Sequence, residues 1–262
     1  MLLKKKYTFV SSMPRSGQTL LASLLHQNKN ICFTPQSQVL LILDSLLYHK
    51  TYNSIYLNFP AEEAYDNVVS EVFNLYYDKF TNAEYILERG PWGLERNRTM
   101  LDFYDKKPKF IVIHRPVLEC LASLMRVETP WRDKQITTSL RCNILMARGG
   151  AMYQAMHSSQ EIVENEDHLL ITYNDIVTDP VGTVKKINEY IGCPFEGVRT
   201  TNLDQYEMKK VKYYDHLLDG IPHQGLHDIR TDSVKKIDYD IEKYLPLDVI
   251  KQYGKADVIW EY

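Results

Sequence analysis

Three arginines of this sequence stand directly after short apolar stretches that are typical of buried strands. They are Arg15, Arg89 and Arg115. A guanidinium holds a phosphate group through a bidentate fork of N–H donors and does not lose its charge. Any one of these arginines alone fits an ordinary surface or helix-capping role. Three of them at one edge of a sheet, beside an anion-binding loop, predict a cleft for a strongly anionic ligand.

The loop after the first apolar stretch has the layout of a phosphate-binding loop but lacks its lysine. When G-x-x-x-x-G-K-[ST] is laid over it, Ser12 takes the place of the first glycine and Gly17 that of the second. Gln18 stands where the lysine belongs, and Thr19 supplies the hydroxyl. A loop of this kind aims backbone N–H groups and a helix N-terminus at an anion. Because its only cation is Arg15, the loop predicts an anionic ligand other than a nucleoside triphosphate.

The elements that must position these residues alternate between strands and helices. Apolar and β-branched runs predict strands at residues 7–12, 31–37, 85–89, 109–114 and 168–173. Helical spacing of apolar residues predicts helices at 19–25, 39–49, 61–80, 116–126, 133–164, 181–191 and 242–253, the fifth weakened by Gly149 and Gly150. Residues 51–60 and 192–232 are expected to be loops.

This alternation predicts a three-layer α/β fold, with helices on both faces of a parallel central sheet as in P-loop NTPases. No linker or repeat divides the sequence, so one domain is expected over residues 1–262. Ligands of such folds bind at the carboxyl ends of the strands. The residues expected there are Arg15, Gln36, Arg89, His114, Arg115 and Tyr173.

Composition excludes several classes of protein. The net charge of −3 argues against general nucleic-acid binding, which needs a basic excess. No apolar run approaches the about 20 residues of a membrane span, and no signal segment precedes the first strand. The four cysteines lack C-x-x-C spacing, which favours buried thiols over a disulfide framework or a metal site. A cytoplasmic protein without a bound metal is therefore expected.

Four stretches resemble the sulfotransferases that use 3′-phosphoadenosine 5′-phosphosulfate (PAPS), and the layout is most similar to that of the tyrosylprotein-type and bacterial members. Pro14-Arg-Ser-Gly-Gln-Thr-Leu resembles their loop for the 5′-phosphosulfate. The stretch from His114-Arg115 to Ser123 resembles the signature in which an arginine, and a serine eight residues later, bind the 3′-phosphate. Ile171-Thr-Tyr-Asn-Asp-Ile-Val-Thr-Asp-Pro is similar to Y-E-D-L-V-x-x-P, and Gln224-Gly-Leu-His-Asp-Ile-Arg to the loop that closes over the nucleotide.

The resemblance implies a P-loop-like sulfotransferase fold and metal-independent, in-line transfer of a sulfuryl group from PAPS to a hydroxyl or amine. The acceptor would be a small molecule, a carbohydrate or a peptide. The implied nucleotide-binding residues are Arg15, Ser16, Gly17, Gln18, Thr19, Arg115, Ser123, Tyr173, His227 and Arg230, with Arg126 as a helper.

The implied catalytic residues are less complete. Arg15 and Arg89 would stabilise charge on the reacting oxygens, with Arg89 in the place of a lysine of the relatives. Gln36 stands where tyrosylprotein-type members have a glutamate base, and an amide accepts no proton. Other sulfotransferases use a histidine base, for which His114 is nearest the expected site. The base is left open between these possibilities.

Two further hypotheses stay open at this point. A kinase or NTPase with a degenerate loop would need a carboxylate for magnesium, for which Glu88 and Asp175 are placed near strand ends. A non-catalytic nucleotide- or carbohydrate-binding protein would share the fold and lack a base. The aromatic segment from Tyr48 to Phe80 is either a helix-packing surface or a wall of the acceptor pocket.

Overall fold

The computed structural model describes residues 4–34, 38–102, 104, 107–128, 135–207 and 227–257. Its centre is a parallel sheet of five strands in the order β2-β3-β1-β4-β5. The strands are β1 (Lys6–Ser12), β2 (Ile31–Phe33), β3 (Tyr85–Arg89), β4 (Lys109–His114) and β5 (His168–Thr172). The predicted parallel sheet is thereby confirmed, with the predicted second strand shorter than expected and residues 35–37 outside the described part.

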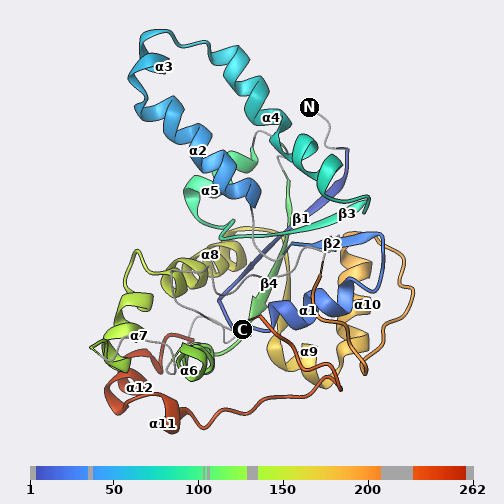
Figure 1. Cartoon of the computed structure of the whole chain (residues 1–262), viewed down its shortest axis with the longest axis vertical. Helices are drawn as coiled ribbons and strands as arrows, with labels where there is room; N and C mark the ends of the chain where they lie inside the picture. Colours follow the sequence, from blue (N-terminus) through green and yellow to red (C-terminus); the bar gives the residue numbers. More distant parts are fainter. Residues whose placement is uncertain are drawn as a thin grey trace.

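Helices cover both faces of the sheet (Figure 1). They are α1 (Gln18–Leu25), α2 (Gln38–Tyr52), α3 (Ser54–Asn58), α4 (Glu62–Phe80), α5 (Glu95–Leu101), α6 (Val117–Glu128), α7 (Thr138–Met146), α8 (Ala151–Asn165), α9 (Tyr173–Thr178), α10 (Pro180–Ile191), α11 (Ile241–Tyr244) and α12 (Leu247–Tyr253). Among the helices of the described residues, none combines the length and the apolar composition that crossing a membrane requires.

The two faces of β1 belong to two different cores because successive side chains of a strand point to opposite sides. Phe9 packs with Phe73 of α4 and with Trp92, all buried. Its neighbour Val10 packs on the other face, in the cluster that contains Leu21 of α1. A third cluster joins α6, α7, α8 and α12. The predicted three-layer arrangement is therefore the observed one.

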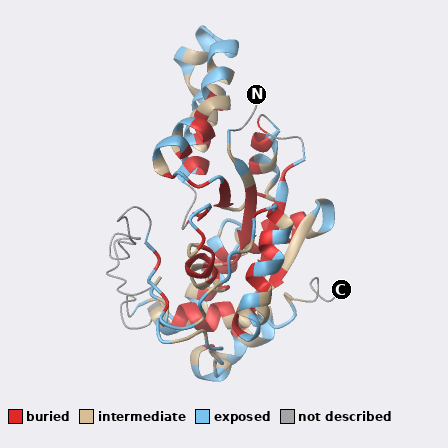
Figure 2. Cartoon of the chain, turned by 90° about the vertical axis from the view of Figure 1, so that its right-hand side faces the viewer, coloured by how far each residue is buried: buried red, intermediate tan, exposed pale blue. Residues whose placement is uncertain are grey.

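Helices α2, α3 and α4 form an arm that extends away from the sheet (Figure 1). Its tip is exposed in Figure 2, whereas its base is buried against the sheet. The exposed apolar side chains of the tip are Tyr48, Tyr52, Ile55, Leu57 and Phe59. The predicted loop at 51–60 was wrong, because the side chain of Asn53 accepts hydrogen bonds from two backbone amides and starts α3 there.

Two predicted helices are each divided in the structure. The helix expected at 133–164 is α7 followed by α8, and residues 133 and 134 lie outside the described part. Gly150 begins α8 where a Cβ atom would stand 2.3 Å from the carbonyl oxygens of Ile144 and Leu145, so only glycine fits this break. The helix expected at 242–253 is α11 and α12, because Pro246 holds the preceding Leu245 in an extended conformation.

Candidate functional site

A cavity of about 420 Å³ opens at the carboxyl edge of the sheet. It is bounded by the loop after β1, the ends of β3 and β4, helix α6, the start of α9 and the segment 227–239. The predicted residues that line it are Arg15, Gly17, Gln18, Thr19, Arg89, Arg115, Ser123, Tyr173, His227 and Arg230, together with Arg126. The structure thus brings together residues that the sequence spreads over more than 200 positions.

The loop between β1 and α1 forms the floor of this cavity. Gly17 has φ of 95° and a Cβ added there would lie 2.8 Å from a ring carbon of Tyr173, so glycine is required on two grounds. Arg15 also has a left-handed backbone, with φ of 71°. The first-turn amides of α1, beginning at Gln18, have no acceptor within the helix and are suited to an anion.

Gln18 acts within the loop. Its side-chain amide donates to the carbonyl oxygens of Ser12 at 3.2 Å and Met13 at 2.8 Å, and it also bonds to the hydroxyls of Ser12 and Ser16. Gln18 and Ser16 are both buried, and Ser16 is absent from the cavity lining. The glutamine in place of the lysine therefore fixes the loop's shape, and the groups of the loop that are suited to an anion are backbone amides and Arg15.

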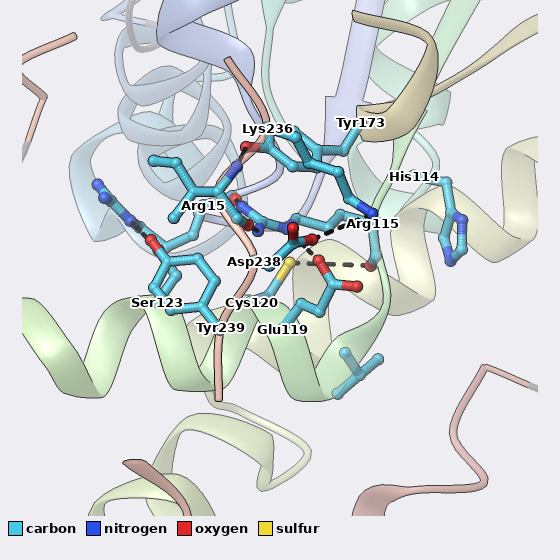
Figure 3. A network of polar contacts seen from close by, with 12 residues as sticks. Arg15, His114, Arg115, Glu119, Cys120, Ser123, Tyr173, Lys236, Asp238 and Tyr239 are labelled. Atoms are coloured by element: carbon cyan, nitrogen blue, oxygen red, sulfur yellow. Dashed lines mark hydrogen bonds and ion pairs between the residues drawn. The ribbon is translucent and has the colours of Figure 1, made fainter. Parts of the chain in front are cut away.

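Arg115 is buried and held on several sides (Figure 3). Its Nε donates to Glu119 at 3.0 Å, Nη1 donates to the carbonyl oxygen of Arg15 at 3.0 Å, and Nη2 donates to that of Ile237 at 3.4 Å. Its guanidinium carbon also lies 3.8 Å from the ring centre of Tyr173. Such a fixed fork presents its remaining donors to the cavity in a single orientation.

Arg15 and Ser123 meet beside Arg115. The Nε of Arg15 donates to the hydroxyl of Ser123 at 3.2 Å, and that hydroxyl lies 3.0 Å from the hydroxyl of Tyr239. Burial lowers the pKa of the Arg15 guanidinium, although an arginine remains charged. Next to them, burial raises the pKa of the Cys120 thiol to about 12, so this thiol stays neutral. The cluster is cationic and contains no reactive thiolate.

His114 takes a different direction. Its Nε2 lies 3.5 Å from a carboxylate oxygen of Asp257, and it is absent from the cavity lining. The same carboxylate accepts two hydrogen bonds from the amide of Val117, at the first residue of α6. Figure 3 shows the ring apart from Arg15 and Ser123. A catalytic role for His114 stays a prediction.

The two carboxylates considered for magnesium both have structural partners. Glu88 is completely buried at the end of β3, where the hydroxyl of Tyr77 donates to it. Asp175 accepts a hydrogen bond from the amide of Thr172 at 2.9 Å, as part of the cap of α9. Neither lines the cavity. Across the described ranges, no group of three or more histidine, cysteine or acidic side chains is arranged to hold a metal ion.

The aromatic segment from Tyr48 to Phe80 contributes nothing to the lining of this cavity. Phe73 and Tyr77 are core residues, and Tyr56 packs against Tyr65 between α3 and α4, with ring centres 5.0 Å apart. Packing therefore accounts for the inner side of the segment, as one of the two hypotheses proposed. The exposed aromatic side chains at the tip of the arm do not line this cavity, so their part in an acceptor site stays a prediction.

Several residues of the site were not found from the sequence. Tyr239 and Ile237 lie in a stretch with no motif, and only the folded chain brings them to α6. Glu119 carried a usable signal, since an acid in the first turn of a helix lies close to an arginine that stands just before the helix. Two expected parts, Gln36 and the residues 224–226 of the C-terminal loop, lie outside the described residues.

Known proteins resemble the chain in sequence pattern and in fold. No curated protein sequence matches it. The structure of mouse sulfotransferase SULT7A1 complexed with PAP is similar at a TM-score of 0.55 and 13% identity, over 97% of this chain and 84% of that one. A sulfotransferase from Alicyclobacillus acidocaldarius matches at a TM-score of 0.49 and 14% identity, over 79% of this chain and 87% of that one. At such identities the similarity to SULT7A1 is one of fold.

The sequence pattern is more specific than the fold. The sequence model of the sulfotransferase family matches residues 8–197, which include the loop of Arg15, the stretch from Arg115 to Ser123 and Tyr173. The match spans well over half of the chain and contains most of the residues that line the cavity. The chain belongs to the sulfotransferase family.

Proposed function

We propose that this sulfotransferase moves the sulfuryl group of PAPS to a hydroxyl or an amine of its acceptor, without a metal ion. One observation carries the proposal: Arg15, Ser123 and Arg115 form a hydrogen-bonded cationic cluster beside the N-terminal turn of α1 in one cavity. A nucleotide with separate 5′ and 3′ anionic groups suits a loop and a second cluster of this kind. The PAP bound in mouse SULT7A1, a structure of the same fold, supports the choice of donor.

The residues divide between the two ends of the nucleotide. The backbone amides from Gly17 to Thr19, with Arg15, are suited to the 5′ group, since helix N-termini attract anions, whereas the amide of Ser16 donates to the carbonyl oxygen of Met13 at 3.3 Å. Arg115 and Ser123 are suited to the 3′-phosphate, because a buried fork and a hydroxyl together bind several phosphate oxygens. The remaining nucleotide contacts fall to Tyr173, His227 and Arg230, all of which line the cavity.

Transfer of the sulfuryl group places negative charge on the oxygen that leaves. Arg15 and Arg89 both line the cavity and supply cations that stabilise such charge, and the loop amides add fixed donors. The kinase alternative finds less support, since Glu88 and Asp175 are engaged by Tyr77 and by the cap of α9. The proposed chemistry therefore relies on cations and N–H donors of the chain.

Calorimetry with PAP, the adenosine 3′,5′-bisphosphate product, tests the binding half of the proposal. Saturable binding is expected, weakened by ~1.5–3 kcal/mol in Arg15→Ala and in Arg115→Ala, the range for hydrogen bonds to charged groups. Arg199→Ala is the matched control, because Arg199 is paired with Asp204 and does not line this cavity. Absence of saturable binding, or magnesium-dependent binding of ATP in its place, would refute the proposal. Transfer of label from PAPS to a panel of hydroxyl and amine acceptors then tests turnover.

A further inference from the structure

The hydroxyl of Ser123 has two protein partners, Arg15 and Tyr239, which line the cavity beside it. The Nε of Arg15 lies 3.2 Å from it and the hydroxyl of Tyr239 lies 3.0 Å from it. Ser123 itself is buried on α6, and its side chain lines the cavity that is proposed to bind the nucleotide. A serine hydroxyl has one proton to donate and two lone pairs to accept with. The hydrogen bonds to its two protein partners therefore determine whether Ser123 can donate to a ligand or only accept from it.

Arg15 uses one lone pair, because a guanidinium only donates. The bond between Ser123 and Tyr239 can run in either direction. When Tyr239 donates, both lone pairs of Ser123 are filled and its single proton is left for the cavity. When Ser123 donates to Tyr239, its proton is used, and it offers the ligand only its second lone pair, which an ionised phosphate oxygen cannot use. An ionised phosphate oxygen, which only accepts, selects the first arrangement.

We propose that Tyr239 is a specificity-determining residue, which orients Ser123 as a donor and so favours a 3′-phosphate over a 3′-hydroxyl. This inference rests on the proposed use of PAPS. A 3′-hydroxyl gains less from the arrangement because it carries no negative charge and makes weaker hydrogen bonds than an ionised acceptor. Selectivity thus depends on a residue 116 positions away from the serine in the sequence.

Neighbouring contacts hold Tyr239 in place. Its ring lies 5.2 Å from the guanidinium carbon of Arg115 and 5.6 Å from that of Arg126. Two residues earlier, the backbone of Ile237 bonds to Arg115 through its carbonyl oxygen and to the hydroxyl of Tyr173 through its amide. Figure 3 shows Tyr239 turned toward Ser123 from this segment. Tyr239→Phe keeps the ring contacts and removes only the hydroxyl.

The experiment compares two nucleotides by calorimetry: PAP, which has the 3′-phosphate, and 5′-AMP, which has a 3′-hydroxyl. Tyr239→Phe is expected to lower the affinity for PAP about 3- to 10-fold, which is the range that one hydrogen bond contributes, and the affinity for 5′-AMP less than about 2-fold. Ser123→Ala is expected to weaken PAP as well, and Tyr239→Phe should then have no further effect in the Ser123→Ala background. Tyr244→Phe is the matched control, because Tyr244 packs near Tyr239 but does not line the cavity.

The outcomes separate this inference from the function on which it rests. If the wild-type protein fails to bind PAP, both are overturned. Three results would overturn only the role of Tyr239, provided that the wild-type protein binds PAP. In the first, Tyr239→Phe lowers the affinities for PAP and for 5′-AMP equally; in the second, it raises the affinity for PAP. In the third, it lowers the affinity for PAP as much in the Ser123→Ala background as in the wild type. Circular dichroism and the midpoint of thermal unfolding establish that each variant is folded before affinities are compared.

Discussion

Arg115→Lys tests whether the site depends on the shape of a guanidinium as well as on its charge. A guanidinium has five N–H donors, and three of those of Arg115 bond to Glu119, to the carbonyl oxygen of Arg15 and to that of Ile237. At most two donors are left for a phosphate. A lysine keeps the charge but has three donors on one atom, so it cannot serve those protein acceptors and a phosphate together.

The expected loss follows from these contacts. PAP should bind ~1.5–3 kcal/mol more weakly, or about 10- to 150-fold, because a bidentate charge-assisted contact is lost. The free energy of unfolding should fall by about 1 kcal/mol, since at least one half-buried carbonyl oxygen, of Arg15 or Ile237, loses its hydrogen bond from Arg115. The affinity for 5′-AMP, which has no 3′-phosphate, should change less than about 2-fold, because Arg115 is assigned to the 3′ end.

Calorimetry with PAP and with 5′-AMP, together with urea unfolding, measures all three quantities. Arg96→Lys is the matched control, since Arg96 pairs with Asp44 at the base of the arm, away from the cavity lining. PAP affinity within about 3-fold of the wild type would show that charge alone suffices. An equal loss of PAP and 5′-AMP would show that Arg115 does not read the 3′ end, and either result refutes the reasoning.

Three further predictions concern the loop and a half-buried histidine. Gly17→Ala should lower the free energy of unfolding by about 1–3 kcal/mol, through backbone strain and the contact of the new Cβ with Tyr173. Gly197→Ala should lower it less, because Gly197 has a similar φ but open space around it. Urea unfolding of both variants measures the difference. Burial lowers the pKa of His26 to about 4, below its usual 6.5, so the unfolded chain binds the proton first as the pH falls. Stability should therefore drop by roughly 2–3 kcal/mol between pH 6.5 and pH 4, and a drop of the same size in His26→Gln would contradict this. Gln18→Lys restores the lysine of a nucleoside-triphosphate loop. It should lower the affinity for PAP and give no magnesium-dependent binding of ATP in calorimetry, because the carbonyl oxygens around residue 18 are bonded to a side-chain amide. Tight binding of ATP by that variant would count against the proposed function.

Local chemistry explains why some elements were predictable. The alternation of apolar runs with helical spacing determined the parallel sheet, because the central strands β1 and β4 are buried on both faces over most of their length. The breaks that were missed depend on single contacts. Gly149 and Gly150 signalled a weak point, but the break at Gly150 follows from its packing on Ile144 and Leu145. Asn53 is a good helix cap, but the helix that it starts has only five residues, which is too short to show the helical spacing of apolar residues.

The order of strands and arginines along the chain was enough to place the cationic edge of the sheet. Parallel strands bring their carboxyl ends to one edge, so Arg15, Arg89 and Arg115 had to share that edge wherever the helices packed. The tertiary structure alone decided how these groups are directed. It joined Tyr239 to Ser123 and turned His114 toward Asp257, since both contacts link segments more than 100 residues apart that no local pattern connects. Spacing along a chain determines which residues reach an edge, whereas packing of distant segments determines which partners they meet there.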